Sequence, residues 1–401
     1  MNVWIVNPFD NLPPEGLRAQ RYWLMARAFA RAGHEVVYWS ADFSHAYKRA
    51  REVSALEGRH EGFTLRLVHE PPYPKNVCPK RLWSHWRFAR NWLARARAEA
   101  KGFRGLNGVR SDKDVKGLKG NGPDVLIVSS PPLSLGAAAR AFCRRTGTKL
   151  VIDIQDAWPE TFQRVVPRCL LAPLARVARR NYKSANAITA VSQRYLDLAL
   201  AYGASCPMYL CYHGIARSPQ LPNSPTPQLP SPPASRLVYI GNMSLSYDLA
   251  TVVEAVRELP DVTLDLAGAG PDEAALRAQA ADCARIRFHG YLDEAALRDL
   301  LAHADVGVIP MFPASQVGLP GKLADYAAAG LPVISSLPGE TAELLARYRA
   351  GVAYAAGDKA SFKTAMVQVR SLEKKGAYAL AVEFDAEKLY NSYLNFVLEK
   401  I

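Results

Sequence analysis

The sequence predicts an α/β protein made of two Rossmann-like, doubly wound domains. Short β-branched runs alternate with helical segments along the chain, which is typical of open parallel sheets. A length of 401 residues suits two domains, and a hydrophobic content of 49% is ample for two packed cores. A proline-rich stretch over residues 217–235 separates the two halves and predicts an extended linker.

The first predicted domain covers residues 1–216 and begins with a strand, a glycine-bearing loop and a helix, which is the opening unit of such a sheet. Its strands are predicted over residues 2–6, 35–39, 63–69, 124–129, 149–154 and 187–191. Its helices are predicted over residues 18–32, over residues 79–104, and in a segment that ends at Thr146.

The second predicted domain covers residues 236–385, and a closing amphipathic helix follows over residues 386–401. Strands are predicted over residues 236–240, 262–267, 286–289, 306–309 and 333–334. Helices are predicted over residues 249–259, 293–303 and 321–329, with a further helix that starts near Gly339.

Composition and charge limit the range of partners and locations that we expect for the protein. A net charge of +13 predicts an anionic partner, which leaves nucleic acid, a phosphorylated substrate or an anionic membrane surface as candidates. The six cysteines form no CxxC pair, so we expect reduced thiols in a cytoplasmic protein. The N-terminus lacks the features of a signal peptide, and no apolar run reaches about 18 residues, so we expect no transmembrane helix.

The loop before the helix at 321–329 has the features of a nucleotide site. Gly318 and Gly321 allow close approach of backbone to a ligand, and N–H groups at a helix start attract phosphate. Lys322 adds a positive charge there, and Asp325, one turn further, presents a carboxylate to vicinal hydroxyls such as those of a ribose. The alternative is that Lys322 and Asp325 form an ordinary i,i+3 surface pair.

The run from 318 to 333, Gly-Leu-Pro-Gly-Lys-Leu-Ala-Asp-Tyr-Ala-Ala-Ala-Gly-Leu-Pro-Val, resembles the donor-binding signature of family 4 glycosyltransferases, the retaining GT-B enzymes also called glycosyl transferases group 1. The Arg-Ala-Gly-His-Glu-Val-Val segment at 31–37 resembles their N-terminal domain. The resemblance implies two domains that face a cleft. It also implies transfer of a sugar from a nucleotide-diphosphate donor with retention, without a metal ion or a resident cofactor.

The same resemblance assigns donor-binding roles to glycines and polar residues at the ends of strands, with Asp325 at the ribose and Lys322 as the phosphate cation. The donor-binding residues it implies are Gly16, Gly241, Asn242, Gly268, Gly270, Gly290, Tyr291, Gly318, Gly321, Lys322, Leu323 and Asp325. The chain departs from the family at Val317, where a glutamate is usual. Ser315, Gln316 or backbone N–H groups from 318 to 322 are the candidates to replace it.

Asp156 is the candidate catalytic residue near the acceptor, together with Lys322 at the donor. Asp156 follows the strand at 149–154, and Gln155 takes the place of a histidine that many family members carry. Arg18, Arg21 and Gln155 are candidate acceptor contacts. The alternatives are that Asp156 caps a helix and that both arginines are solvated.

Residues 80–104 combine arginines with Trp83, Trp86, Phe88 and Trp92. Such a helix can lie on an anionic membrane surface, or its aromatic side chains can face the core. Together with the resemblance, the helix suggests a glycan or lipid-linked acceptor in the biosynthesis of envelope polysaccharides. It is also the only candidate stripe for nucleic acid, a partner that we do not expect.

Three alternatives remain at this stage. An epimerase or a hydrolase of the GT-B class would share the donor site, and a catalytically weak binding protein would account for the charge alone.

Asp112-Lys113-Asp114 matches the DxD pattern by which other glycosyltransferases hold a metal, but its glycine- and lysine-rich context favours a chance match.

Overall fold

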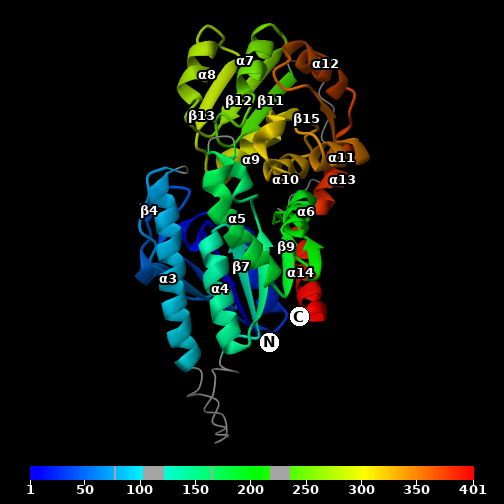
Figure 1. The fold of residues 1–401 in the computed structure, drawn as a ribbon. Helices are drawn as coiled ribbons and strands as arrows, with labels where there is room; N and C mark the ends of the chain where they lie inside the picture. The colour runs from blue at the N-terminus through cyan, green and yellow to red at the C-terminus, as the bar shows by residue number, and fades with distance from the viewer. Residues whose placement is uncertain (76–77, 103–121, 164–165, 217–234) are drawn as a thin grey trace, which may run out of the picture. The chain divides into compact units, whose positions relative to one another are not determined.

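The computed structural model describes the chain except for residues 76–77, 103–121, 164–165 and 217–234. The Asp112-Lys113-Asp114 motif and nearly all of the predicted linker lie outside the described residues. The described chain divides into two compact units. Unit 1 holds Met1–Tyr212 together with Glu387–Ile401, and unit 2 holds His213–Ala386 (Figure 1).

Unit 1 is built on an eight-stranded sheet in the order β10-β9-β8-β7-β1-β2-β6-β5, parallel except where β5 pairs with β6. Its strands are β1 (Asn2–Val6), β2 (Glu35–Ala41), β5 (Gly58–His60), β6 (Phe63–Val68), β7 (Val125–Ser130), β8 (Lys149–Ile154), β9 (Ala187–Ala190) and β10 (Met208–Leu210), and β3 (Phe43–Ser44) with β4 (Arg49–Ala50) forms a separate ribbon. Its α-helices are α1 (Arg21–Arg31), α2 (Val53–Leu56), α3 (Pro79–Gly102), α4 (Leu133–Thr146), α5 (Arg168–Lys183), α6 (Gln193–Ala201) and α14 (Ala386–Lys400).

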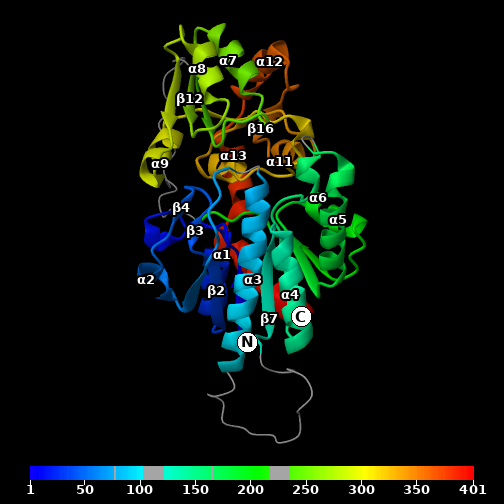
Figure 2. The same cartoon turned by 60° about the vertical axis from the view of Figure 1, so that its left-hand side comes forward.

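The main core of unit 1 lies between one face of the sheet and helices α3, α4, α5 and α6. Helices α3 and α4 lie side by side over this face (Figure 2). The C-terminal helix α14 packs against α1 through a ring contact between Tyr393 and Phe29, whose centroids are 6.4 Å apart. Aromatic stacking of Phe396 on Tyr209, with centroids 5.0 Å apart, ties the same helix to the edge strand β10.

The aromatic residues of helix α3 fall into two groups along its length. Phe88 and Trp92 are fully buried, in agreement with the alternative that the aromatic side chains face the core. Trp83 and Trp86, near its start, remain 48% and 44% exposed, so the amphipathic character applies only to this part. No described helix combines the length and the apolar character that crossing a membrane requires.

Unit 2 has a six-stranded sheet, parallel throughout, in the order β13-β12-β11-β14-β15-β16. Its strands are β11 (Ser235–Ile240), β12 (Val262–Ala267), β13 (Ile286–Gly290), β14 (Val306–Ile309), β15 (Val333–Ser335) and β16 (Gly351–Ala353). Its α-helices are α7 (Leu249–Arg257), α8 (Glu273–Ala280), α9 (Glu294–Ala302), α10 (Lys322–Ala328), α11 (Glu340–Arg347), α12 (Lys359–Val369) and α13 (Lys374–Ala381). Its main core includes α7, α8 and α12 on one face of the sheet, and α10 packs against α13.

Most predicted elements are confirmed within a few residues, and the strands at 149–154, 262–267 and 306–309 are matched in full. The predicted start of the first helix at Arg18 is wrong, because the helix begins only at Arg21. Gln20 precedes it with an extended backbone (φ −110°, ψ −175°). The three residues before Arg21 therefore belong to the loop.

Candidate active site

The candidate donor site lies at the carboxyl edge of the unit 2 sheet. The chain passes from β11 to β12 and β13 on one side, and then places β14 on the other side of β11. The carboxyl ends of β11 and β14 therefore form a topological switch point, where open parallel sheets bind ligands. Gly241 follows the first of these strands, and the loop before Lys322 follows the second.

Glycines allow the loops at this edge to pack backbone against backbone. A Cβ atom on Gly268 would lie 2.0 Å from the carbonyl oxygen of Gly241, and one on Gly270 would lie 2.0 Å from that of Met243. The N–H of Gly268 donates to the carbonyl of Gly290 over 2.6 Å, which joins the loops after β12 and β13. No side chain larger than hydrogen fits at Gly268 or Gly270, so the sequence forms this surface from main-chain groups.

The amine of Lys322 lies beside Gly241. A Cβ atom added to Gly241 would lie 3.2 Å from Nζ. Nζ lies 3.8 Å from the ring centroid of Tyr239 and 4.2 Å from that of Tyr247. The residue is only 9% exposed, and its amine has no hydrogen-bond partner among the described residues. Burial lowers the pKa of Lys322 well below its ordinary value. An anion at this point would supply both the missing partner and the missing counter-charge.

Tyr326 fixes helix α10 to the sheet and thereby positions Lys322. Its hydroxyl accepts from the N–H of Ile240 at 3.1 Å and lies 3.2 Å from the carbonyl of Val238. Gly307 on β14 leaves room for the ring, because a Cβ atom there would lie 2.6 Å from it. The sequence analysis did not predict a role for Tyr326. The signal that could have indicated one is its position directly after Asp325, on the buried face of the helix.

The start of α10 corrects part of the prediction. The N–H of Leu323 donates to the carbonyl of Pro320 at 3.0 Å, and the N–H of Ala324 donates to that of Gly321 at 3.1 Å. These bonds use N–H groups that we expected to bind phosphate. The Leu323 side chain is fully buried, so it is a core residue rather than a donor contact.

The remaining donor candidates are placed as follows. Asp325 lies in the first turn of α10 and is half-buried. The Gly318 carbonyl accepts from the Thr341 hydroxyl at 3.1 Å, whereas Gly321 is exposed. The carbonyl of Asn242 accepts from the Tyr239 hydroxyl, which ties the loop after β11 to its own strand.

Tyr291 projects away from the loops with 77% of its surface exposed. Val317 is half-buried at the position where the family carries a glutamate, and Gln316 beside it adopts a left-handed backbone with φ +63°. Ser315 is buried, and its hydroxyl has no hydrogen-bond partner within the described parts of the chain. Among the proposed replacements, Ser315 therefore retains an unused polar group.

Asp156 lies in unit 1 at the carboxyl end of β8. Its carboxylate accepts from the N–H of Ala157 at 2.8 Å and from the indole N–H of Trp158 at 3.1 Å. Burial raises its pKa, while the charge of Arg81 acts in the opposite direction. The following 3-10 helix, Glu160–Phe162, has Pro159 at its N-cap position, so Asp156 is not the helix cap of the alternative reading.

The structure gathers a second group of polar and aromatic side chains near Asp156, which the sequence did not predict. Arg81 on α3 lies 5.1 Å from the ring centroid of Trp158, and its Nε–H donates to His85 Nε2 at 3.3 Å. Arg81 also lies 6.0 Å from the ring centroid of Tyr73, whose hydroxyl forms a 2.5 Å hydrogen bond with His45 Nδ1. We call these side chains, with Asp156, the Arg81 cluster. They come from loops and a helix that are distant in sequence.

Two buried carboxyl groups lie in loops that follow other strands of this sheet. Burial raises the pKa of Asp10, after β1, to about 7, although the Tyr22 N–H donates to it at 2.8 Å. Burial raises the pKa of Glu70, after β6, to about 8, and the Ser84 hydroxyl donates to it at 3.1 Å. Both groups therefore titrate near neutral pH.

Two family models match the chain over its two halves. The model described as Glycosyltransferase Family 4 matches residues 20–218. The model described as Glycosyl transferases group 1 matches residues 234–371. The chain is a family 4 glycosyltransferase. The predicted enzyme class and the GT-B fold are thereby confirmed.

Solved structures share the fold of this glycosyltransferase at low sequence identity. Sucrose-phosphate synthase from Thermosynechococcus elongatus matches with a TM-score of 0.70 and 13% identity, over 99% of this chain and 98% of that one. HepE from Anabaena, solved with UDP and glucose, matches with a TM-score of 0.64 and 13% identity over the whole of both chains. The lipopolysaccharide outer core galactosyltransferase WaaB matches with a TM-score of 0.62 and 12% identity, also over the whole of both. No curated protein sequence gives a significant match.

The prediction that Arg21 of the glycosyltransferase contacts the acceptor is wrong. Arg21 supports the fold of unit 1 and is not available to an acceptor. Its guanidinium donates to both carboxylate oxygens of Asp153, at 2.8 and 2.9 Å, and to the carbonyls of Cys211 and Tyr212. Arg21 is 3% exposed, so it is not the solvated arginine of the alternative either. No local pattern could indicate this pairing, because Asp153 is 132 residues away.

The other unit 1 candidates remain near the surface. Gln155 of the glycosyltransferase is half-buried, and its amide donates to Asp153 at 2.5 Å. Gly16 ends the 3-10 helix Pro13–Glu15 with φ +75°, a conformation that favours glycine. Arg18 lies in the loop before α1 and is half-buried.

Proposed function

We propose that this glycosyltransferase uses a nucleotide-diphosphate sugar as its donor, bound at the carboxyl edge of the unit 2 sheet. The single observation that carries the proposal is the Lys322 amine, buried beside Gly241 without a hydrogen-bond partner among the described residues. A diphosphate would pair with this amine and with main-chain groups of the glycine-lined loops. In this proposal Asp325 accepts hydrogen bonds from the ribose hydroxyls.

In the proposed reaction a hydroxyl of the acceptor attacks the anomeric carbon from the face that the diphosphate leaves. A carbon–oxygen bond to the acceptor forms, and the bond between the anomeric carbon and the diphosphate oxygen breaks. The acceptor proton passes to the departing phosphate oxygen, and the sugar keeps its anomeric configuration. Lys322 stabilises the negative charge that develops on the diphosphate, so we propose that no metal ion is required.

We propose that unit 1 binds the acceptor at the Arg81 cluster, because this cluster lies where loops follow the parallel strands. Asp156 orients the attacking hydroxyl there through its carboxyl group, whose pKa is raised by burial. The acceptor is a glycan or a lipid-linked saccharide of the cell envelope. We further propose that the enzyme works in the cytoplasm at an anionic membrane surface, through the exposed Trp83 and Trp86 and the basic residues near them.

A thermal-shift screen of UDP, GDP, ADP and their sugars tests the donor site. A ligand at 100 times its dissociation constant adds about 2.7 kcal/mol to the free energy of unfolding. We expect one nucleotide to shift the wild type and to lose its effect in Asp325→Ala. Asp282→Ala is the matched control, because Asp282 precedes β13, at the amino ends of the strands, and pairs with exposed Arg257 at 2.7 Å. Equal shifts in both variants would contradict the proposed ribose contact, and no shift with any nucleotide would contradict the donor site.

A further inference from the structure

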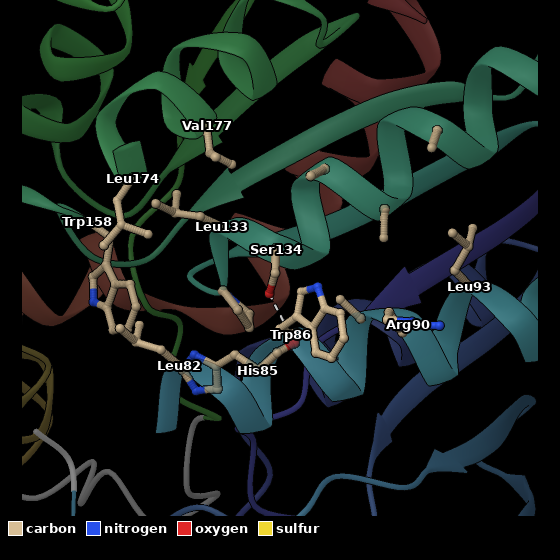
Figure 3. Close-up of a pocket in the computed structure, with 15 residues that line it drawn as sticks. Leu82, His85, Trp86, Arg90, Leu93, Leu133, Ser134, Trp158, Leu174 and Val177 are labelled. Atoms are coloured by element: carbon tan, nitrogen blue, oxygen red, sulfur yellow. Dashed lines mark hydrogen bonds between the residues drawn. The ribbon is translucent and has the colours of Figure 1, made fainter. Parts of the chain in front are cut away.

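Unit 1 contains an apolar groove of about 490 Å³ between helices α3, α4 and α5 (Figure 3). The side chains that line the groove differ in size from one helix to the next. Helix α4 contributes the small residues Ala137, Ala138 and Ala141, at positions that share one helical face. Helix α3 contributes large side chains such as Leu82 and Leu93, and α5 contributes Leu174. The volume is within the usual range for ligand pockets, about 300–1,000 Å³.

One end of this groove is part of the Arg81 cluster. Leu82, His85 and Trp158 lie together at that end, and Leu93 lies at the other (Figure 3). Trp158 also donates to Asp156, and Arg81 contacts both Trp158 and His85. The apolar groove is therefore continuous with the proposed acceptor position.

His85 adds a polar feature at this end. It is 2% exposed, and Arg81 donates to its Nε2, so Nδ1 carries the ring proton. That Nδ1 has no hydrogen-bond partner among the described residues. Buried polar atoms without partners are rare, so an acceptor atom from a ligand would complete the bonding of this side chain.

Two cations lie at this groove. Arg90 is a lining residue, and its guanidinium lies 4.8 Å from the ring centroid of Trp86, which also lines the groove. Arg81 lies beside the end that His85 and Trp158 form. An apolar channel with cations at these positions matches a molecule that has an apolar chain and an anionic head.

We propose that the groove holds the hydrocarbon chain of an amphiphilic acceptor, a lipid-linked saccharide whose phosphate lies at Arg81. The inference rests on the proposed function and narrows its acceptor class. Arginine binds phosphate through a planar, forked set of donors, and each CH₂ of the chain that the groove buries adds to the binding free energy. Together these contacts would hold the saccharide of the acceptor close to Asp156.

The test uses decyl phosphate below its micellar concentration as the probe, with calorimetric titration of the full-length protein. Ala138→Trp fills the groove and is expected to weaken binding at least tenfold. Ala98→Trp, on an exposed part of α3 outside the groove, is the matched control and is expected to stay within twofold of the wild type. Arg81→Gln should weaken binding of decyl phosphate but not that of decanol, and inorganic phosphate should bind far more weakly than decyl phosphate.

The outcomes separate this inference from the proposed function. Equal losses in Ala138→Trp and Ala98→Trp, or no binding to the wild type, would overturn the groove assignment. Binding of anionic phospholipid vesicles that Ala138→Trp abolishes, without binding of monomeric decyl phosphate, would show a membrane-docking site instead and also overturn it. A nucleotide shift that persists in Ala138→Trp shows that unit 2 is folded and that the donor site stands, and a cooperative denaturation followed by tryptophan fluorescence shows that unit 1 is folded. A missing nucleotide shift in the wild type would contradict the proposed function, whatever decyl phosphate does.

Discussion

The Lys322 amine lies 3.8 Å from the ring centroid of Tyr239, at the carboxyl end of β11 in unit 2. An aromatic face partly compensates a buried cation, by about 0.5–2 kcal/mol, but it provides no hydrogen-bond acceptor. The site therefore places an incompletely satisfied group where the proposed donor phosphate would lie. Such a group lowers the stability of the free protein and increases its affinity for an anion.

Lys322→Met is expected to separate stability from donor binding. The change keeps an unbranched side chain, one atom shorter, and removes a buried amine without a hydrogen-bond partner among the described residues. We therefore expect the free protein to gain about 1–3 kcal/mol. The variant should lose the nucleotide-induced thermal shift. Differential scanning calorimetry with and without nucleotide measures both effects. A loss of stability in the free variant would show that the amine is satisfied in solution.

Donor binding is expected to weaken as pH rises from the lowered pKa of Lys322 in the free site towards its higher pKa in the complex. The pKa of Lys322 is lowered in the free site, and a bound diphosphate would raise it. Between these two pKa values binding takes up one proton, so affinity falls by about tenfold per pH unit there. Titrations in buffers of different ionisation enthalpy measure this proton uptake directly. Lys322→Met serves as the control, and the same uptake in that variant would assign the proton to another group.

Gly268→Ala is expected to disrupt the donor edge of the unit 2 sheet. The new methyl group would meet the Gly241 carbonyl oxygen at 2.0 Å, and φ at this position is +122°. Gly357→Ala is the matched control, because Gly357 also has a positive φ, +81°, but has open space around its Cβ position. We expect about 1 kcal/mol of backbone cost in the control, with nucleotide binding kept, and loss of binding in Gly268→Ala. Unchanged nucleotide affinity in Gly268→Ala would contradict the close packing of these loops.

Arg21→Ala is expected to destabilise unit 1 by about 3–5 kcal/mol, because it leaves Asp153 buried without its counter-charge. Arg27→Ala, on the same helix, breaks only a partly exposed pair with Glu61 at 3.3 Å, and should cost less than about 1 kcal/mol. All seven tryptophans lie in residues 1–212, so denaturation followed by tryptophan fluorescence reports on unit 1. Similar losses in the two variants would argue against a dominant role for the buried pair.

The fold could be predicted from the sequence because its signals are local. The strand at Lys149–Ile154 is a continuous apolar run with one buried Asp153, and Gly330 ends helix α10 with φ +70°. The loop that carries Lys322 was predicted for the same reason, since its glycines, its cation and the following helix are adjacent in sequence. The family resemblance likewise depended on continuous runs, this one and the segment at 31–37.

The contacts that position these residues depended on tertiary structure. Arg21 finds its partner Asp153 132 residues away, so no local pattern could distinguish it from a solvated arginine. The Arg81 cluster likewise joins side chains from loops after several strands with the start of α3. Local sequence patterns were therefore enough to predict the fold class, the enzyme family and the structure of the loop that carries Lys322. Only the packing of distant segments decided which cations are buried in ion pairs and which are left beside a glycine-lined edge, because burial and pairing arise from contacts across the sheet.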